Sequence, residues 1–202
     1  MLPALFATFG GNEADVGFVL ALTAITTLIV VIYSGHITAW IGMMPSITLS
    51  GILITLAGLF FGLAREAGLL VQVAGLLLGA GWGLFYTLTP VVLNRVIHPH
   101  ERIQYFTLLS VFIMAGFGLL PVFGATLTRL GFDLGMTFFA TAGLCGISVI
   151  LFFWLTKPMR ALTIEKQIIA KTGLSRVVIK DVMTSRAAIP VIMVGIGASV
   201  FA

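Results

Sequence analysis

The sequence predicts an all-α integral membrane protein, a bundle of about six transmembrane helices. Its 202 residues are 59% hydrophobic and only 9% charged, whereas soluble domains carry roughly 25% charged residues. The charged residues lie almost wholly outside the apolar runs. About 20 apolar residues cross a hydrocarbon core of about 30 Å as a helix, so the chain has room for at most roughly eight crossings and for no large soluble domain.

Charge and cysteine content narrow the function classes. The chain has 11 basic and 7 acidic residues and a pI near 9.6. In a membrane protein this balance indicates loops that face anionic lipid headgroups, and we expect no nucleic-acid partner. The single cysteine, Cys145, lies within an apolar run, so neither a disulfide framework nor a cysteine-rich metal site can form within this chain.

The first segments are a short apolar stretch and one full crossing. Residues 1–10 are apolar but about half the length of a crossing, and they lack the basic residues that begin a signal peptide. We therefore expect them to be the end of a span. Asn12, Glu13 and Asp15 form a polar turn, and residues 16–40 then run apolar for the length of a membrane helix.

The remaining crossings follow after short connections. Pro45 marks a tight connection before the second crossing, which ends at Arg65. The second, third, fourth and fifth crossings span residues 47–64, 68–93, 104–130 and 137–156, in that order. Residues 190–202 are apolar but too short to satisfy their backbone across a bilayer. We therefore expect the chain to be incomplete at both ends.

The basic residues predict the orientation, because Lys and Arg are retained on the cytoplasmic side of a membrane. Of the 11 Lys and Arg residues, all but Arg65 and Arg129 fall in one alternate set of connections, which we place in the cytoplasm. That set includes the only long loop, residues 157–187. Its basic residues alternate with Ile and Val, a pattern that fits either amphipathic helices on the inner leaflet or a solvated linker.

The hairpin between the first two crossings carries a family resemblance. In SGHITAWIGMMPSI, Gly35 and Gly42 permit a close backbone approach and a tight reversal. Their spacing resembles the signature that joins the second and third helices of the major facilitator superfamily. The acidic and basic positions of that signature are occupied here by Ala39, Trp40, Met43 and Met44. The resemblance therefore implies that gating relies on packing, or on a charge clasp built elsewhere.

The third crossing combines small residues with a polar and aromatic stripe. Gly75, Gly79 and Gly83 recur four residues apart, a spacing that lets helices approach closely in lipid, and the stretch resembles the glycine-rich fourth helix of the superfamily. Four larger side chains lie among and beyond these glycines, the first three on one helical face: Trp82, Tyr86, Thr89 and Asn94. The stripe either lines a substrate cavity, which is our hypothesis, or forms an aromatic packing seam whose hydroxyls bond to backbone carbonyls.

The fourth crossing is rich in glycine around a proline. Its stretch MAGFGLLPVFGATL predicts a kink and a close packing surface in mid-membrane, through Gly116, Gly118, Pro121 and Gly124. The pattern resembles a weakened form of the antiporter signature in the fifth helix of the superfamily. That signature is associated with exporters, so the resemblance favours efflux.

The sequence offers no candidate for catalysis or metal binding. No predicted crossing carries an Asp, Glu, Lys or Arg in mid-membrane, the residues that mark ion pathways and proton relays. His98 and His100 lack a third ligand and fit a solvated loop. No residue pattern typical of intramembrane hydrolysis or of a potassium filter is present. We expect no enzyme, no metal and no cofactor.

Taken in chain order, these segments resemble most of the N-terminal half of a major facilitator superfamily transporter. The resemblance covers the entire chain and implies a twelve-helix fold of two bundles that rock about a central site. It implies three regions: an N-terminal bundle from the end of helix 1 to helix 6 over residues 1–156, a cytoplasmic central linker over residues 157–187, and the start of helix 7 over residues 188–202. The remaining half of the transporter would then be a partner.

The resemblance implies a secondary transporter that works by alternating access, and the weakened antiporter signature favours efflux. The aromatic and hydroxylic stripe favours a small, rather apolar organic compound as the substrate. A proton is a candidate coupling ion, and the lipid bilayer of a bacterial inner membrane is the expected setting. The alternative is a protein that does not transport. It would be a truncated, inactive fragment or a scaffold that packs against partner helices through Gly75, Gly79 and Gly83.

Overall fold

A computed structural model describes residues 2–96 and 100–155 of the chain. These residues form six helices, α1 to α6, and contain no strand. The helices span Leu2–Thr8, Glu13–Ile41, Met43–Leu63, Leu69–Val96, Arg102–Arg129 and Leu134–Leu155. The predicted linker over residues 157–187 and the predicted start of helix 7 over residues 188–202 lie outside the described residues.

The predicted fold class is confirmed. Five of the helices, α2 to α6, are long and apolar enough to cross a membrane, and each corresponds to one of the predicted crossings, with ends that differ by a few residues. The structure extends α2 to Glu13, because Asn12 caps it: the Asn12 side chain accepts from the Asp15 backbone N–H, and the Asp15 carboxylate accepts from the Asn12 N–H. This reciprocal capping box satisfies donors that the first turn of a helix leaves open.

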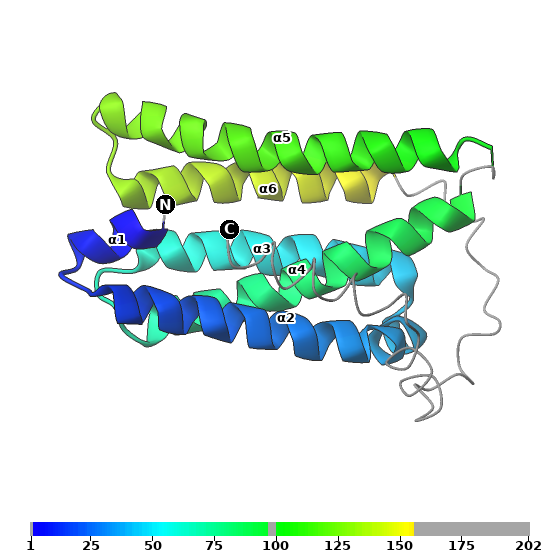
Figure 1. The fold of residues 1–202 in the computed structure, drawn as a ribbon, viewed down its shortest axis with the longest axis horizontal. Helices are drawn as coiled ribbons and strands as arrows, with labels where there is room; N and C mark the ends of the chain where they lie inside the picture. The colour runs from blue at the N-terminus through cyan, green and yellow to red at the C-terminus, as the bar shows by residue number, and fades with distance from the viewer. Residues whose placement is uncertain (1, 97–99, 156–202) are drawn as a thin grey trace, which may run out of the picture. The chain divides into compact units, whose positions relative to one another are not determined.

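Helix α4 lies at the centre of the packing. It contacts α2 along one side and α3 along another, and α3 in turn packs against α6. Figure 1 shows these long helices running alongside one another, with α5 beside α6. The contacts of α5 with α4 and α6 are sparse in comparison. The described bundle therefore consists of a closely packed group, α2, α3, α4 and α6, and one loosely attached helix, α5.

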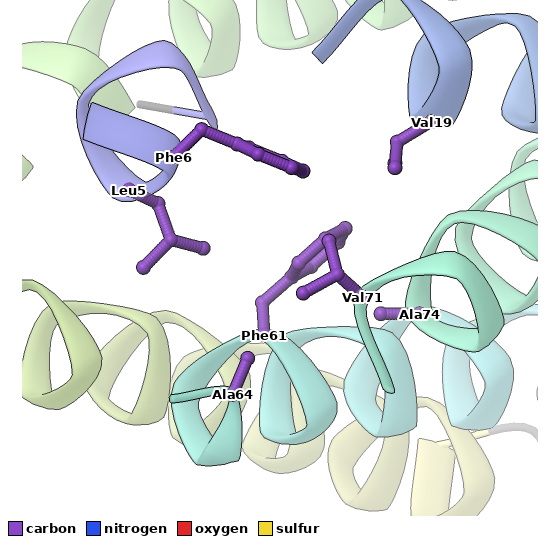
Figure 2. Close-up of a cluster of buried hydrophobic side chains, with 7 residues drawn as sticks. All are labelled: Leu5, Phe6, Val19, Phe61, Ala64, Val71 and Ala74. Carbon is purple, nitrogen blue, oxygen red and sulfur yellow. The ribbon is translucent and has the colours of Figure 1, made fainter. Parts of the chain in front are cut away.

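A small apolar core joins α1 to the ends of the neighbouring spans. In Figure 2 its side chains come from α1 and α2, from the end of α3 and from the start of α4. They are Leu5, Phe6, Val19, Phe61, Ala64, Val71 and Ala74. A helix as short as α1 is not stable alone, so this burial, with Phe6 only 2% exposed, is what holds it.

The outer surface of the spans is apolar. Large hydrophobic side chains of α2, α5 and α6 are exposed, among them Leu28, Phe112 and Trp154. A soluble monomer rarely exposes a continuous apolar surface of this kind. The surface suits contact with lipid, as the composition predicted.

Candidate functional site

Glycines on α4 bring it against α2. A Cβ atom added to Gly75 would lie 2.9 Å from Val19 Cγ1, and one added to Gly83 would lie 2.9 Å from the Thr27 carbonyl oxygen. A Cβ added to Gly79 would collide with the Thr23 carbonyl oxygen. The three glycines singled out in the sequence therefore form the face of α4 that contacts the α2 backbone.

Two threonines of α2 hydrogen-bond across the same contact. Thr23 Oγ1 lies 3.1 Å from the Gly75 carbonyl oxygen, and Thr27 Oγ1 lies 3.0 Å from the Gly79 carbonyl oxygen. Each hydroxyl also lies within hydrogen-bond distance of the carbonyl four residues earlier in α2. These two threonines were not predicted from the sequence. The available signal was their four-residue spacing, which matches that of the glycines they face.

Small residues also join α3 to its two neighbours. A Cβ added to Gly81 of α4 would lie 2.9 Å from the Ser50 carbonyl oxygen of α3. On the other side of α3, a Cβ at Gly58 would lie 3.0 Å from Ala142 Cβ of α6, and one at Gly62 would lie 3.1 Å from the Gly135 carbonyl oxygen. Close backbone approach of this kind is how helices pack in lipid, where the hydrophobic effect gives no drive to association.

The aromatic residues of the predicted stripe form a pair on α4. The Trp82 and Tyr86 rings lie 6.2 Å apart between centroids and meet edge to face, at 85°. Tyr86 is 40% exposed, whereas Trp82 is partly buried. Asn94 is exposed near the end of α4. No Asp, Glu, Lys or Arg lies in α4 before Arg95, so the surface around the pair is uncharged along this helix.

A cavity of about 490 Å³ opens beside this pair, between α3, α4 and α6. The ring of Phe85, which lines the cavity, lies 5.7 Å from the Tyr86 ring between centroids. The α4 wall of the cavity consists of Phe85, Thr89, Val92 and Leu93. Its other walls include Ile47, Gly51 and Ile54 of α3, Cys145, Val149 and Phe152 of α6, and Leu109 of α5. Of the four residues predicted to line a substrate cavity, the structure places only Thr89 here. Trp82, Tyr86 and Asn94 are not among its lining residues.

Thr89 is exceptional among the hydroxyl residues of the described spans. Every other described Ser or Thr hydroxyl lies within hydrogen-bond distance of a backbone carbonyl oxygen. Thr89 Oγ1 is buried and has no hydrogen-bond partner among the described residues. Bonding to backbone carbonyls was the alternative interpretation of these hydroxyls from the sequence. Thr87, whose hydroxyl lies 2.8 Å from the Gly83 carbonyl oxygen, agrees with it.

Helix α5 runs without interruption through Pro121. A Cβ added to Gly116 or Gly118 would meet no described atom within 4 Å, so these glycines face open space. Pro121 is exposed, whereas Gly124 is buried. Helix α5 has only sparse contacts with its neighbours. The predicted role of these four residues in bending and packing α5 stays a prediction.

The hairpin turns at one residue. Gly42 alone separates α2 from α3 and has φ +91° and ψ 160°, a region essentially restricted to glycine. Its N–H donates to the Thr38 carbonyl at 2.9 Å, and its carbonyl oxygen accepts from Ser46 Oγ at 2.6 Å. Gly35 lies within α2, before the turn. Trp40, on a basic position of the family signature, is 88% exposed beside it.

No group of three or more His, Cys, Asp or Glu side chains that could hold a metal ion occurs within residues 2–96 and 100–155. His98 lies outside the described residues. His100 Nε2 lies 3.9 Å from Glu101 Oε1 in the connection before α5.

A family model described as Major Facilitator Superfamily matches the chain over residues 1–202, its full length. The chain belongs to the major facilitator superfamily. Searches of curated proteins and of solved structures found no significant match. The resemblance inferred from the hairpin and the glycine-rich helices is thereby confirmed.

Membership of the superfamily indicates the general function of this helical bundle. Major facilitator proteins are multi-pass membrane transporters of small molecules, and the five apolar spans of this one fit that role. Its hairpin keeps the glycine turn of the superfamily but offers Ala39, Trp40, Met43 and Met44 where the signature has charges. Met44 is only 6% exposed, so in this major facilitator protein one of those positions contributes to packing.

Proposed function

We propose that this major facilitator protein exports a small, uncharged and mainly apolar organic compound by alternating access, in the inner membrane of a bacterium. The supporting observation is the Trp82–Tyr86 pair on α4. It combines an aromatic surface that is partly exposed with a helix that has no charged residue before Arg95.

The chemistry of this face argues for an uncharged substrate. Aromatic rings bind apolar bodies over a large area, and the Tyr86 hydroxyl supplies one polar group. A charged substrate would need a counter-charge in a region where unpaired charges are costly. Helices α2 to α6 carry charged residues only in their first and last turns. Coupling to a proton would therefore have to use a carboxylate outside the middle of these spans.

The close packing of α2, α3, α4 and α6 supports alternating access, because a bundle that rocks must move as a unit. These four helices are joined by close glycine contacts, whereas α5 has sparse contacts with α4 and α6. The preference for export rests on the glycine and proline pattern of α5, which resembles the exporter signature.

The scaffold alternative receives less support. That hypothesis required Gly75, Gly79 and Gly83 to face a helix of another protein. In the structure these glycines already contact α2 of the same chain, so a partner helix could reach them only by displacing α2.

The test is flux of an uncharged fluorescent dye by the full-length protein in membrane vesicles. Inside-out vesicles should accumulate the dye and right-side-out vesicles should not. Trp82→Ala and Tyr86→Ala should each lower the initial rate about ten-fold, if each removes on the order of 1.4 kcal/mol of binding to the moving substrate. The matched control is Trp154→Ala on α6, where the side chain is 67% exposed, and it should leave the rate unchanged. Unchanged flux in both α4 variants would refute the proposal that this face carries substrate.

A further inference from the structure

We propose that the cavity between α3, α4 and α6 is a second binding site, next to the Trp82–Tyr86 pair, for an uncharged and mainly hydrocarbon molecule that carries one hydrogen-bond acceptor such as a ketone or ester oxygen. This site does not depend on the export proposal. It is defined by binding, which can be measured without any flux.

The size and lining of the cavity match a small organic ligand. Its volume of about 490 Å³ falls within the roughly 300–1,000 Å³ that small-molecule sites occupy. The lining is dominated by apolar side chains, including Ile54, Phe85, Val92 and Phe152, and contains no charged residue. A charged ligand would lose its hydration here without gaining a counter-charge, so the ligand is uncharged.

Thr89 supplies the specific polar contact. Its hydroxyl is buried without a hydrogen-bond partner among the described residues, and Thr89 itself lines the cavity. A buried donor without a partner costs free energy in a region of low dielectric. Rotation of the Thr89 side chain would turn its buried hydroxyl toward the cavity, where a ligand oxygen that accepts from Thr89 Oγ1 would recover that cost. A pure hydrocarbon would not.

The site lies next to the aromatic pair but has its own lining. On α4 it is lined by Phe85, Thr89, Val92 and Leu93, and the Phe85 ring meets the Tyr86 ring edge to face at 5.7 Å between centroids. Trp82 and Tyr86 are outside the cavity lining. A molecule in the cavity would touch α3 and α6, and also Leu109 of α5. On α4 it would meet Phe85, which lies between the cavity and Tyr86.

Cys145 provides a reporter, because it lines the same cavity. The full-length protein is placed in nanodiscs of dioleoyl phosphatidylcholine and alkylated with N-ethylmaleimide. The modified fraction of Cys145 is followed by mass spectrometry of its peptide. The probe is prodan, an uncharged naphthalene with one ketone, and the comparison compound is the alkyl naphthalene in which a methylene replaces the carbonyl.

We expect prodan to slow the alkylation of Cys145 in a saturable way. The alkyl compound should bind about five-fold more weakly than prodan, because it lacks one neutral hydrogen bond. Thr89→Val, which keeps the shape of the side chain, should weaken prodan about five-fold and leave the alkyl compound unchanged. The matched control Thr87→Val should bind prodan normally, because the Thr87 hydroxyl already lies 2.8 Å from the Gly83 carbonyl oxygen. A cysteine introduced on the exposed surface of α6 by Trp154→Cys should show no protection.

A second variant keeps the test decisive if Thr89→Val folds poorly. Ser148 lines the cavity at an exposed position of α6, so Ser148→Phe should fill part of the space and abolish protection by prodan. The proposal is overturned if prodan fails to protect Cys145, or if Ser148→Phe leaves protection intact. It is also overturned if prodan and the alkyl compound protect equally, since the cavity would then accept any lipid tail without selection.

Discussion

Replacing Gly79 by alanine should separate α4 from α2 and destabilise the protein. The added Cβ would collide with the Thr23 carbonyl oxygen and would lie 3.0 Å from the Thr23 carbonyl carbon and 3.1 Å from its Cα. All three atoms belong to the backbone of α2, so no side-chain rotation can relieve the contact. Helix α2 must move away as a whole.

The size of the effect combines steric strain with weakened hydrogen bonds. Overpacking of a close contact costs about 1–3 kcal/mol. The displacement would also stretch the bonds from Thr23 Oγ1 to the Gly75 carbonyl and from Thr27 Oγ1 to the Gly79 carbonyl, each worth about 0.6 kcal/mol between membrane helices. We therefore expect Gly79→Ala to lower the free energy of unfolding by about 2–4 kcal/mol.

The matched control is Gly116→Ala on α5, where an added Cβ would meet no described atom within 4 Å. That variant should be neutral or up to about 1 kcal/mol more stable, because alanine favours the helix. Both free energies can be measured from the unfolding of the purified protein in mixed micelles with increasing dodecyl sulfate. If Gly79→Ala unfolded at the same dodecyl sulfate fraction as the wild type or as Gly116→Ala, the close approach of α2 and α4 would be refuted.

Three further predictions concern the packing of α2 against α4 and the ends of the bundle. Thr27→Val should lower the free energy of unfolding by about 0.6 kcal/mol. Thr26→Val removes a hydrogen bond within α2 only and should lower it by less. Equal losses in the two variants would show that the Thr27 hydroxyl makes no stabilising bond to α4. Gly42→Ala should cost about 1–3 kcal/mol, because φ +91° and ψ 160° strain any residue with a Cβ, whereas Gly35→Ala should be tolerated. Phe6→Ala should cost about 3–5 kcal/mol of local stability and speed amide hydrogen exchange across α1; unchanged exchange there would mean that the apolar core does not hold α1.

Much of the fold was predictable because the bilayer imposes one rule on every span. A helix must be long and apolar to cross, so the apolar runs predicted α2 to α6 directly. The polar turn at Asn12 and the glycine at Gly42 marked helix ends, since a capping side chain and a positive φ are properties of single residues. The family was also recognisable from motif spacing, and the match over residues 1–202 confirmed it.

The candidate site was less predictable. Trp82, Tyr86 and Thr89 were placed together from helical spacing, yet only Thr89 lines the cavity, while Trp82 and Tyr86 pair with each other outside it. Spacing shows which residues share a side of one helix, but not which neighbouring helix meets that side. The walls contributed by α3 and α6, including Gly51 and Cys145, carried no motif that could have connected them with α4.

Length, hydropathy and glycine spacing are local properties of the chain, and they were enough to predict a helical membrane bundle of the major facilitator type. Which faces of the helices lie inside depends on tertiary packing. In lipid, the side of a helix that meets another helix is about as apolar as the side that meets an acyl chain. The pairing of Thr23 and Thr27 with α4, and the Thr89 hydroxyl that lacks a partner within the described spans, therefore emerge only when the helices are brought together.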